Sequence, residues 1–136
     1  MADQLENALQ ASVSKVPECL AAGYVDLESG MLLGVRTVDS HPSEVLDLLA
    51  AATAEMFQGS NVTSIEQIFK KARGVKDDGT HYFNEMIVNS ENLIHIFIRC
   101  KTNPNHVATF VCRISANLGM ALSKARAALP EVEAAA

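Results

Sequence analysis

Few residues of this 136-residue chain have the types and spacing that chemistry needs. Asp39, Ser40 and His41 are the three residue types of a hydrolytic triad, but they are consecutive. Consecutive side chains cannot adopt the geometry in which an oriented base activates a nucleophile. Ser40 or His41 fits better as a helix cap, because a helical pattern starts directly after them. The chain also lacks P-loop, dinucleotide-binding, metalloprotease and EF-hand motifs, so we predict that it has no catalytic residues.

The soft metal ligands of the chain are also poorly spaced. His95 and Cys100 are five residues apart, so an alternating strand puts them on opposite faces. His106 and Cys112 share a face but lie roughly 20 Å apart along a strand, too far for one metal. Asp77-Asp78-Gly79 resembles half of a calcium loop and lacks the distal Glu. We therefore predict no metal or other cofactor, and we interpret His81, His95 and His106 as histidines of a half-buried sheet.

A basic cluster stands out in an acidic chain. Lys70, Lys71, Arg73 and Lys76 fall within seven residues, whereas the net charge is −5. The simpler interpretation is a solvated face, since local charge runs are usually solvated. The alternative is a contact surface for an acidic protein partner, with Lys70, Lys71 and Arg73 as its candidate residues.

Composition narrows the class of protein. The pI of about 5.3 and the absence of Trp argue against nucleic-acid binding. We see no signal peptide and no apolar run of membrane-spanning length, so we expect a cytoplasmic protein. Its three cysteines, an odd number without CxxC spacing, are expected to be reduced and buried. The length predicts one domain over residues 1–130, followed by a flexible tail at 131–136.

The first part of the chain predicts a helix and a hairpin. Apolar residues at helical spacing indicate a helix over residues 3–16, which Pro17 ends. Residues 19–27 and 31–38 predict two strands around a turn at 28–30 that contains a glycine. Both strands are apolar at nearly every position, which is typical of strands covered on both faces.

The helix predicted over residues 42–58 has an unusual pattern. A helix on the surface of a small monomer should show one apolar stripe, and this one shows two. The first stripe is Val45, Leu48, Leu49, Ala52 and Met56, and the second is Leu46, Ala50 and Phe57. We interpret the second stripe as a subunit interface, with burial by the chain's own loops as the alternative.

A short helix and three strands follow. Thr63 and Glu66 have the spacing of a capping box, which predicts a helix from there to Ala72. Ile65, Ile68 and Phe69 are expected to face inward. Runs rich in β-branched and aromatic residues then predict strands joined by short turns, and such turns require antiparallel neighbours. These strands span residues 82–88, 93–100 and 106–113.

The last predicted element is a helix over residues 116–129. Ser115 is its expected cap, and Pro130 is expected to end it. Ile114, Leu118, Ala121, Leu122, Ala125 and Leu129 are expected to face inward. Gly119 lowers helix stability by about 1 kcal/mol relative to Ala, so we expect close packing against the sheet at this position.

This order predicts an α+β fold, a five-stranded antiparallel sheet with helices on both faces. Together with residues 114–122, Ile-Ser-Ala-Asn-Leu-Gly-Met-Ala-Leu, it resembles the roadblock/dynein light chain superfamily. In that family the last strand leads into a helix with an Ala-Asn-Leu-Gly-like opening. The first hairpin, with Gly23-Tyr24-Val25-Asp26 and Leu32-Leu33, is also similar. The resemblance implies a roadblock/profilin-like fold with a β-β-α-β-β-β-α core.

The resemblance also implies a homodimer without catalytic residues. In the family, two edge strands join the sheets and the second helices pack together, which here means residues 81–89 and 42–58. The implied interface residues are Leu46, Ala50, Thr53, Phe57, Phe83, Glu85 and Ile87. Family members are regulators and scaffolds, and some bacterial ones activate Ras-like GTPases. We therefore expect a regulatory module that binds a protein partner, with a Ras-like GTPase as the candidate. The alternative is a small-molecule sensor with a pocket between sheet and helices.

Overall fold

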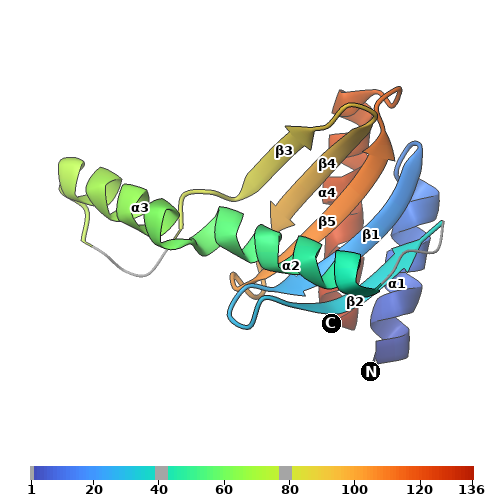
Figure 1. Ribbon diagram of the computed structural model, residues 1–136, viewed down its shortest axis with the longest axis horizontal. Helices are drawn as coiled ribbons and strands as arrows, with labels where there is room; N and C mark the ends of the chain where they lie inside the picture. Colours follow the sequence, from blue (N-terminus) through green and yellow to red (C-terminus); the bar gives the residue numbers. More distant parts are fainter. Residues whose placement is uncertain (1, 39–42, 77–80) are drawn as a thin grey trace.

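The computed structural model describes residues 2–38, 43–76 and 81–136, with the backbone alone at 2, 3 and 43–47. Within these residues, four helices and five strands follow one another as the sequence predicts (Figure 1). Their bounds are α1 Ala2–Lys15, β1 Cys19–Asp26, β2 Met31–Thr37, α2 Ser43–Gln58, α3 Ser60–Ala72, β3 Glu85–Asn89, β4 Leu93–Arg99, β5 His106–Arg113 and α4 Leu118–Ala135.

The strands form one antiparallel sheet in the order β2-β1-β5-β4-β3. Short turns make β1–β2, β3–β4 and β4–β5 hairpins, as the turn residues predicted. In the first turn Gly30 has a φ of 71°, which glycine adopts without strain. The strands at the two edges of the sheet are β2 and β3.

Helices α1 and α4 cover one face of the sheet, and together they enclose the main core. Alternation along the strands sends Tyr24, Ile96 and Phe110 to this face, where they are fully buried. Gly34 of β2 lets α1 come close, because a Cβ at this position would lie 2.9 Å from a methyl carbon of Leu5. The core fixes α1 and α4 on the sheet.

Helix α2 lies on the opposite face and covers only part of it (Figure 1). Phe57 near its C-terminus is fully buried in a second, smaller cluster with Leu27 and Val107. After Gly59 the chain continues directly as α3, which extends away from the sheet past β3. We call α3 the arm.

The arm differs from the predicted short helix. It begins at Ser60, so Thr63 lies inside the helix and donates to the carbonyl oxygens of Gly59 and Ser60. Glu66 is buried and accepts hydrogen bonds from residues outside the helix, so the capping box is wrong. Ile65, Ile68 and Phe69 are exposed instead of facing inward, and Ile68 is 63% exposed.

Helix α4 also departs from its prediction at both ends. Asn117, not Ser115, caps it, because the Asn117 Oδ1 accepts from the Met120 amide at 3.0 Å. The prediction that Pro130 ends the helix is wrong, since the helix continues to Ala135 and Val132 in its last turns is fully buried. Ile114 and Leu118 are exposed rather than inward.

The coverage of β2, the state of the cysteines and the packing of Gly119 can also be compared with their predictions. Strand β2 is not covered on both faces, because Met31 is 62% exposed and Leu33 is also exposed. The three cysteines are free and buried, as predicted. Gly119 does not pack against the sheet, since an added Cβ would meet only the Asn117 side chain at 3.4 Å. The predicted cap at Ser40 or His41 and the Asp77-Asp78-Gly79 motif lie outside the described residues.

Candidate functional site

The side of helix α2 that is exposed to solvent is not the side that we predicted from the sequence as a subunit interface. Ala50, Thr53 and Phe57 are buried against the chain's own sheet. The exposed stripe is Leu48 and Leu49 with Ala51 and Ala52, and Leu48 is 71% exposed. Among the described side chains of α2, the side that remains exposed is therefore this stripe. The Leu46 side chain lies outside the described part of the chain.

Strand β3 forms the edge of the sheet that the arm passes. It pairs with β4 on one side, and its other side has no strand neighbour among the described residues. Ile87 and Val88 are adjacent and both exposed, so the strand is apolar on both faces at this edge. An open edge with apolar side chains is a template for pairing with another chain.

Glu85 at the start of β3 is paired within the chain. Its carboxylate accepts two hydrogen bonds from the Arg126 guanidinium of α4, at 2.6 and 2.8 Å. These hydrogen bonds are the main reason why the pKa of Glu85 is below its ordinary value. Glu85 is the one charged residue of β3, and Arg126 neutralises it. Little charge repulsion would therefore oppose the pairing of this edge with another strand.

Phe83 precedes β3 and is tied to the sheet by a buried arginine. The Arg99 guanidinium donates from Nε to the Phe83 carbonyl oxygen at 3.0 Å and from Nη1 to that of Pro104 at 2.7 Å. Its Nη2 donates to the carbonyl oxygen of Phe57 at 3.2 Å. Arg99 therefore links the end of α2, the entry to β3 and the β4–β5 turn.

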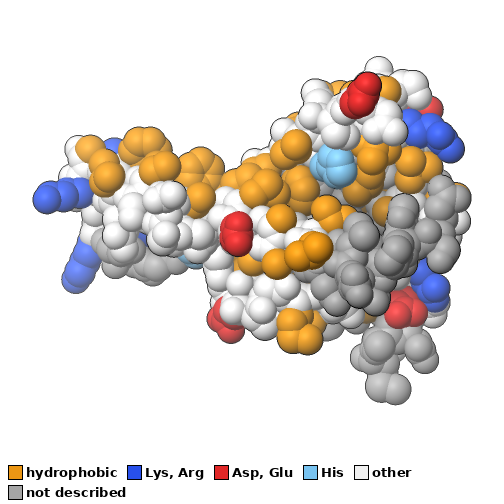
Figure 2. All heavy atoms as spheres, in the orientation of Figure 1, with side chains coloured by type: hydrophobic (Ala, Val, Ile, Leu, Met, Phe, Trp, Pro, Cys, Tyr) orange, Lys and Arg blue, Asp and Glu red, His pale blue; other side chains and the backbone are white. Residues whose placement is uncertain are grey.

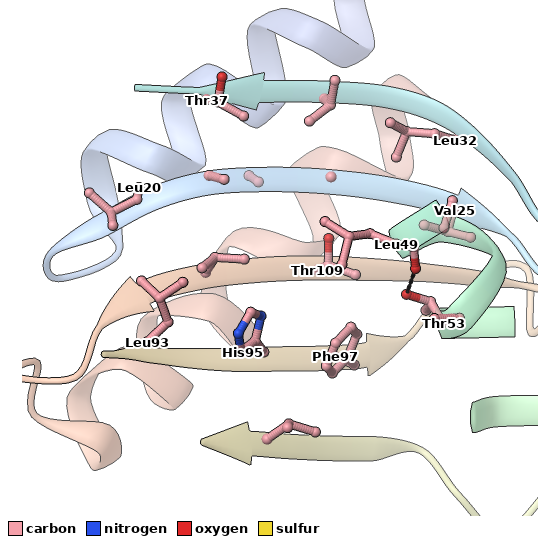
Figure 3. A pocket seen from close by; sticks show the side chains of 18 of the residues that line it. Leu20, Val25, Leu32, Thr37, Leu49, Thr53, Leu93, His95, Phe97 and Thr109 are labelled. Carbon is pink, nitrogen blue, oxygen red and sulfur yellow. Dashed lines mark hydrogen bonds between the residues drawn. The ribbon is translucent and has the colours of Figure 1, made fainter. Parts of the chain in front are cut away.

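Beside α2, the uncovered part of the sheet forms an apolar depression of about 450 Å³, which we call the trough. Figure 3 shows Leu93 and His95 along β4, with Leu49 and Thr53 of α2 to one side. The Thr53 hydroxyl donates its proton to the Leu49 carbonyl oxygen at 2.8 Å, so it can offer a ligand only an acceptor. Outside α2, the residues that line the trough include Leu20, Val35, Val88, Leu93, His95 and Val111.

His95 is the titratable group in the wall of the trough. Its Nε2 lies 3.3 Å from the Ser90 hydroxyl, and its ring stacks on Phe97 at a centroid distance of 6.4 Å. Burial lowers the pKa of His95, because the charged ring loses hydration there. The neutral ring is thus favoured, and the trough is better suited to an apolar surface than to an anion.

The inner side of the arm is anchored by Glu66. Its carboxylate accepts from the Tyr82 amide at 2.6 Å and lies 2.9 Å from Nδ1 of His81. Phe69 lies beside the Tyr82 ring with a centroid distance of 6.0 Å. These contacts fix the arm to the chain just before β3 and leave its apolar outer side uncovered (Figure 2).

The basic cluster is divided between the interior and the surface. Lys70 is 4% exposed, and its ammonium lies 6.0 Å from the centre of the Tyr82 ring. Lys71, Arg73 and Lys76 are exposed. The surface that a partner could reach therefore comprises Lys71, Arg73 and Lys76, without Lys70.

The candidate metal ligands have structural roles or lie apart. His81 contacts Glu66, and His106 contacts the Tyr24 hydroxyl at 2.9 Å. Cys100 and Cys112 are buried, and burial raises the pKa of Cys100 to about 11. Among the described residues, no three His, Cys, Asp or Glu side chains are grouped to hold a metal ion.

In the same part of the chain, no helix is long and apolar enough to span a membrane.

The element order, the sheet topology and the placement of the helices define a roadblock/profilin-like fold, as predicted. Similar solved structures include the gliding protein MglB from Thermus thermophilus (TM-score 0.70, 17% identity, 99% of this chain and 90% of that one). A Roadblock/LC7 domain from Streptomyces avermitilis has a TM-score of 0.65 and 13% identity, over 95% of this chain and 94% of that one. An MglB in a tetrameric arrangement has a TM-score of 0.65 and 18% identity, over 99% of this chain and 92% of that one. No protein-family profile and no curated protein sequence matches the chain.

Sequence reasoning missed Arg99, the position of His95 in the wall of the trough and the exposed outer side of the arm. A signal for Arg99 was present, because an arginine at the end of an otherwise apolar strand requires several hydrogen-bond acceptors when buried. The sequence of the arm was misleading, because apolar residues at this helical spacing also occur in helices that pack on their own domain.

Proposed function

We propose that the chain is a non-enzymatic homodimeric module in which β3 of one copy pairs with β3 of another. The observation that carries this proposal is the open edge of β3, with Ile87 and Val88 exposed on its two faces. Pairing would satisfy the free backbone groups of the edge and cover both side chains. The predicted interface residues Phe83, Glu85 and Ile87 lie at this edge, although Glu85 already pairs with Arg126.

The roadblock fold supports self-association, and one similar structure, an MglB, is in a tetrameric arrangement. A twofold axis normal to the sheet would join the two sheets into one and keep both α2 helices on one face. The exposed stripe of Leu48, Leu49, Ala51 and Ala52 then belongs to a composite surface. We propose that this surface binds a protein partner and biases its conformation.

The dimer can be tested with lysines at the two sheet edges. Ile87→Lys places a charge in the proposed interface, whereas Leu33→Lys places the same charge at the exposed edge strand β2. Analytical ultracentrifugation should show dimers for the wild type and for Leu33→Lys, and monomers for Ile87→Lys. A wild type that is monomeric at micromolar concentration, or dissociation by Leu33→Lys alone, would contradict the proposal.

For the partner, we propose a Ras-like GTPase, as the family resemblance implies. The exposed basic residues Lys71 and Arg73 are the candidate contact. The rate of GTP hydrolysis by such a GTPase from the same organism should change when this protein is added. Lys71→Glu with Arg73→Glu should remove the effect, and Lys124→Glu on α4 should retain it. An unchanged hydrolysis rate with the wild type, together with no binding, would exclude this partner.

The trough supports a second candidate function, the sensing of a small apolar molecule. Its size lies within the range of ligand pockets, and its walls are mainly apolar. A ligand that binds only the folded chain raises the melting temperature by mass action. A concentration-dependent rise with an uncharged medium-chain alcohol as probe would favour this function, and its loss in Val111→Lys would place the ligand in the trough.

A further inference from the structure

Two apolar surfaces of this chain are uncovered among the described residues. One is the trough, with half-buried Leu20, Leu93, His95 and Val111 and exposed Val88. The other is the outer side of the arm, where Ile65, Ile68, Phe69 and Ala72 are exposed at helical spacing, with Phe69 at the border of this side because its ring also lies beside Tyr82. Figure 2 shows hydrophobic side chains gathered both over the arm and over the sheet beside α2. Soluble monomers seldom expose apolar patches of this kind.

We propose that the occupant of the trough is the arm of a second copy of this chain, and that the two copies exchange arms reciprocally. Ile65, Ile68 and Phe69 of one copy lie on the trough of the other. The inference rests on the proposed dimer through β3 and deepens it, because it adds a second contact that the edge strands do not provide.

The position of the arm fits this exchange. The arm follows α2, which lies on the trough face, and extends past β3, the strand at the proposed junction (Figure 1). A twofold axis normal to the sheet keeps the same face of both sheets on one side. The arm of one copy therefore passes over the trough face of the other. Its 13 residues measure about 20 Å, which is the width of roughly four strands.

The surface area that a stable dimer must bury also favours the exchange of arms. Strand β3 has five residues, and pairing two such strands buries far less than the roughly 1,200–2,000 Å² of a standard interface. Two arms on two troughs supply the missing apolar area. Phe69 is aromatic, and aromatic residues are enriched in the buried cores of protein interfaces.

The polar groups at both surfaces are compatible with an apolar contact. On the arm, Glu66 is turned inward by its hydrogen bond with Tyr82, so no carboxylate lies among the apolar side chains of the outer side. In the trough, Thr53 donates to Leu49, and burial lowers the pKa of His95, which favours its uncharged form. A small polar ligand would find few free partners here, whereas an apolar helix face needs none.

Cross-linking between two different variants tests the exchange. Ile68→Cys chains are mixed with His95→Cys chains, one of them tagged, and oxidised with copper phenanthroline after subunit exchange. The matched control is Gln67→Cys, which is exposed on the same helix one residue away. We expect a tagged–untagged disulfide dimer several-fold more abundant with Ile68→Cys than with Gln67→Cys. Wild-type chains, whose cysteines are buried, give the background.

The outcomes separate this inference from the dimer itself. If ultracentrifugation shows dimers but Ile68→Cys cross-links no more than Gln67→Cys, arm exchange is wrong and the β3 dimer stands. If a single chain with both Ile68→Cys and His95→Cys forms an internal disulfide at high dilution, the arm folds on its own trough and exchange is also wrong. If the wild type is monomeric at all concentrations, both proposals fail.

Discussion

The guanidinium of Arg99 at the end of β4 donates to the carbonyl oxygen of Phe57 at 3.2 Å and lies 5.2 Å from the centre of its ring. Phe57 lies in the last turn of α2, where carbonyl groups lack partners within the helix. A positive charge is also favourable there, because the helix dipole is negative at its C-terminus. Arg99 thus holds the end of α2 on the sheet and sets the direction in which the arm leaves.

Replacing Arg99 should therefore lower the free energy of unfolding more than replacing a surface arginine does. Arg99→Met leaves the carbonyl groups of Phe57, Phe83 and Pro104 without their donor, and we expect a loss of about 2–4 kcal/mol in unfolding free energy. The matched control Arg113→Met, at an exposed position of β5, should change stability by less than about 0.5 kcal/mol. Urea denaturation measures both values, and equal losses would contradict the role of Arg99.

Two glycines should respond in opposite directions to alanine. At Gly34 a Cβ would come within 2.9 to 3.2 Å of Leu5 and Leu9, so Gly34→Ala should force α1 outward and destabilise by about 1–3 kcal/mol. At Gly119, in the first turn of α4, the new Cβ would meet only Asn117 at 3.4 Å. Gly119→Ala should stabilise by up to about 1 kcal/mol, because alanine favours helix. Urea unfolding of both variants checks the signs.

His95 should make stability depend on pH. Burial lowers its folded pKa below the unfolded value of about 6.5, so the unfolded chain binds more protons in that range. Its contribution to stability is complete above pH 6.5 and is lost as pH falls through that value towards the folded pKa. The loss stays below about 1.4 kcal/mol per pH unit, because one proton is involved and the ring is partly solvated.

The comparison that isolates this effect is His95→Gln, which cannot titrate. Thermal unfolding of the wild type and of His95→Gln should diverge between pH 7.5 and 5.5, with the wild type losing more stability. His81→Gln serves as a control for a histidine that contacts a carboxylate. Parallel pH profiles for the wild type and His95→Gln would show that His95 does not carry the dependence.

The strands and their hairpin pairings could be predicted because their signals are local, whereas the pairing of β1 with β5 joins distant parts of the chain. Alternating β-branched residues define β3, β4 and β5, and short turns such as 101–105 determine antiparallel pairing. The side of α2 that meets the sheet could not be predicted in the same way. A helical wheel shows two apolar stripes, and only packing against Leu27 and Val107 places Phe57 inward and leaves Leu48 exposed.

The end of α4 shows a similar limit. A proline inside a helix costs about 3 kcal/mol, which made Pro130 a reasonable stop. Distant contacts offset this cost: Val132 is fully buried, and Glu133 accepts from the Lys101 amide at 2.6 Å. Lys15 of α1 also pairs with Glu131 at 3.0 Å. None of these contacts is visible in the local sequence of the helix, so the residues of the expected tail lie in a packed helix.

Glu66 should hold the arm on the segment that precedes β3. Glu66 is 3% exposed and accepts from the Tyr82 amide, so Glu66→Ala leaves a backbone donor without its partner. The lost bond is worth about 1–3 kcal/mol, and the arm adds little to the main core. We therefore expect local loosening: amide exchange over residues 60–72 should accelerate at least about tenfold, while β1 and β5 stay protected.

Glu66→Gln keeps an acceptor for the Tyr82 amide and should restore most of the protection, whereas Gln67→Ala on the exposed side should have no effect. Exchange followed by mass spectrometry on all three variants makes the comparison. If Glu66→Ala instead accelerates exchange equally in the arm and in the central strands, the arm and sheet unfold as one unit. Glu66 would then stabilise the whole domain rather than orient the arm that we propose to be exchanged.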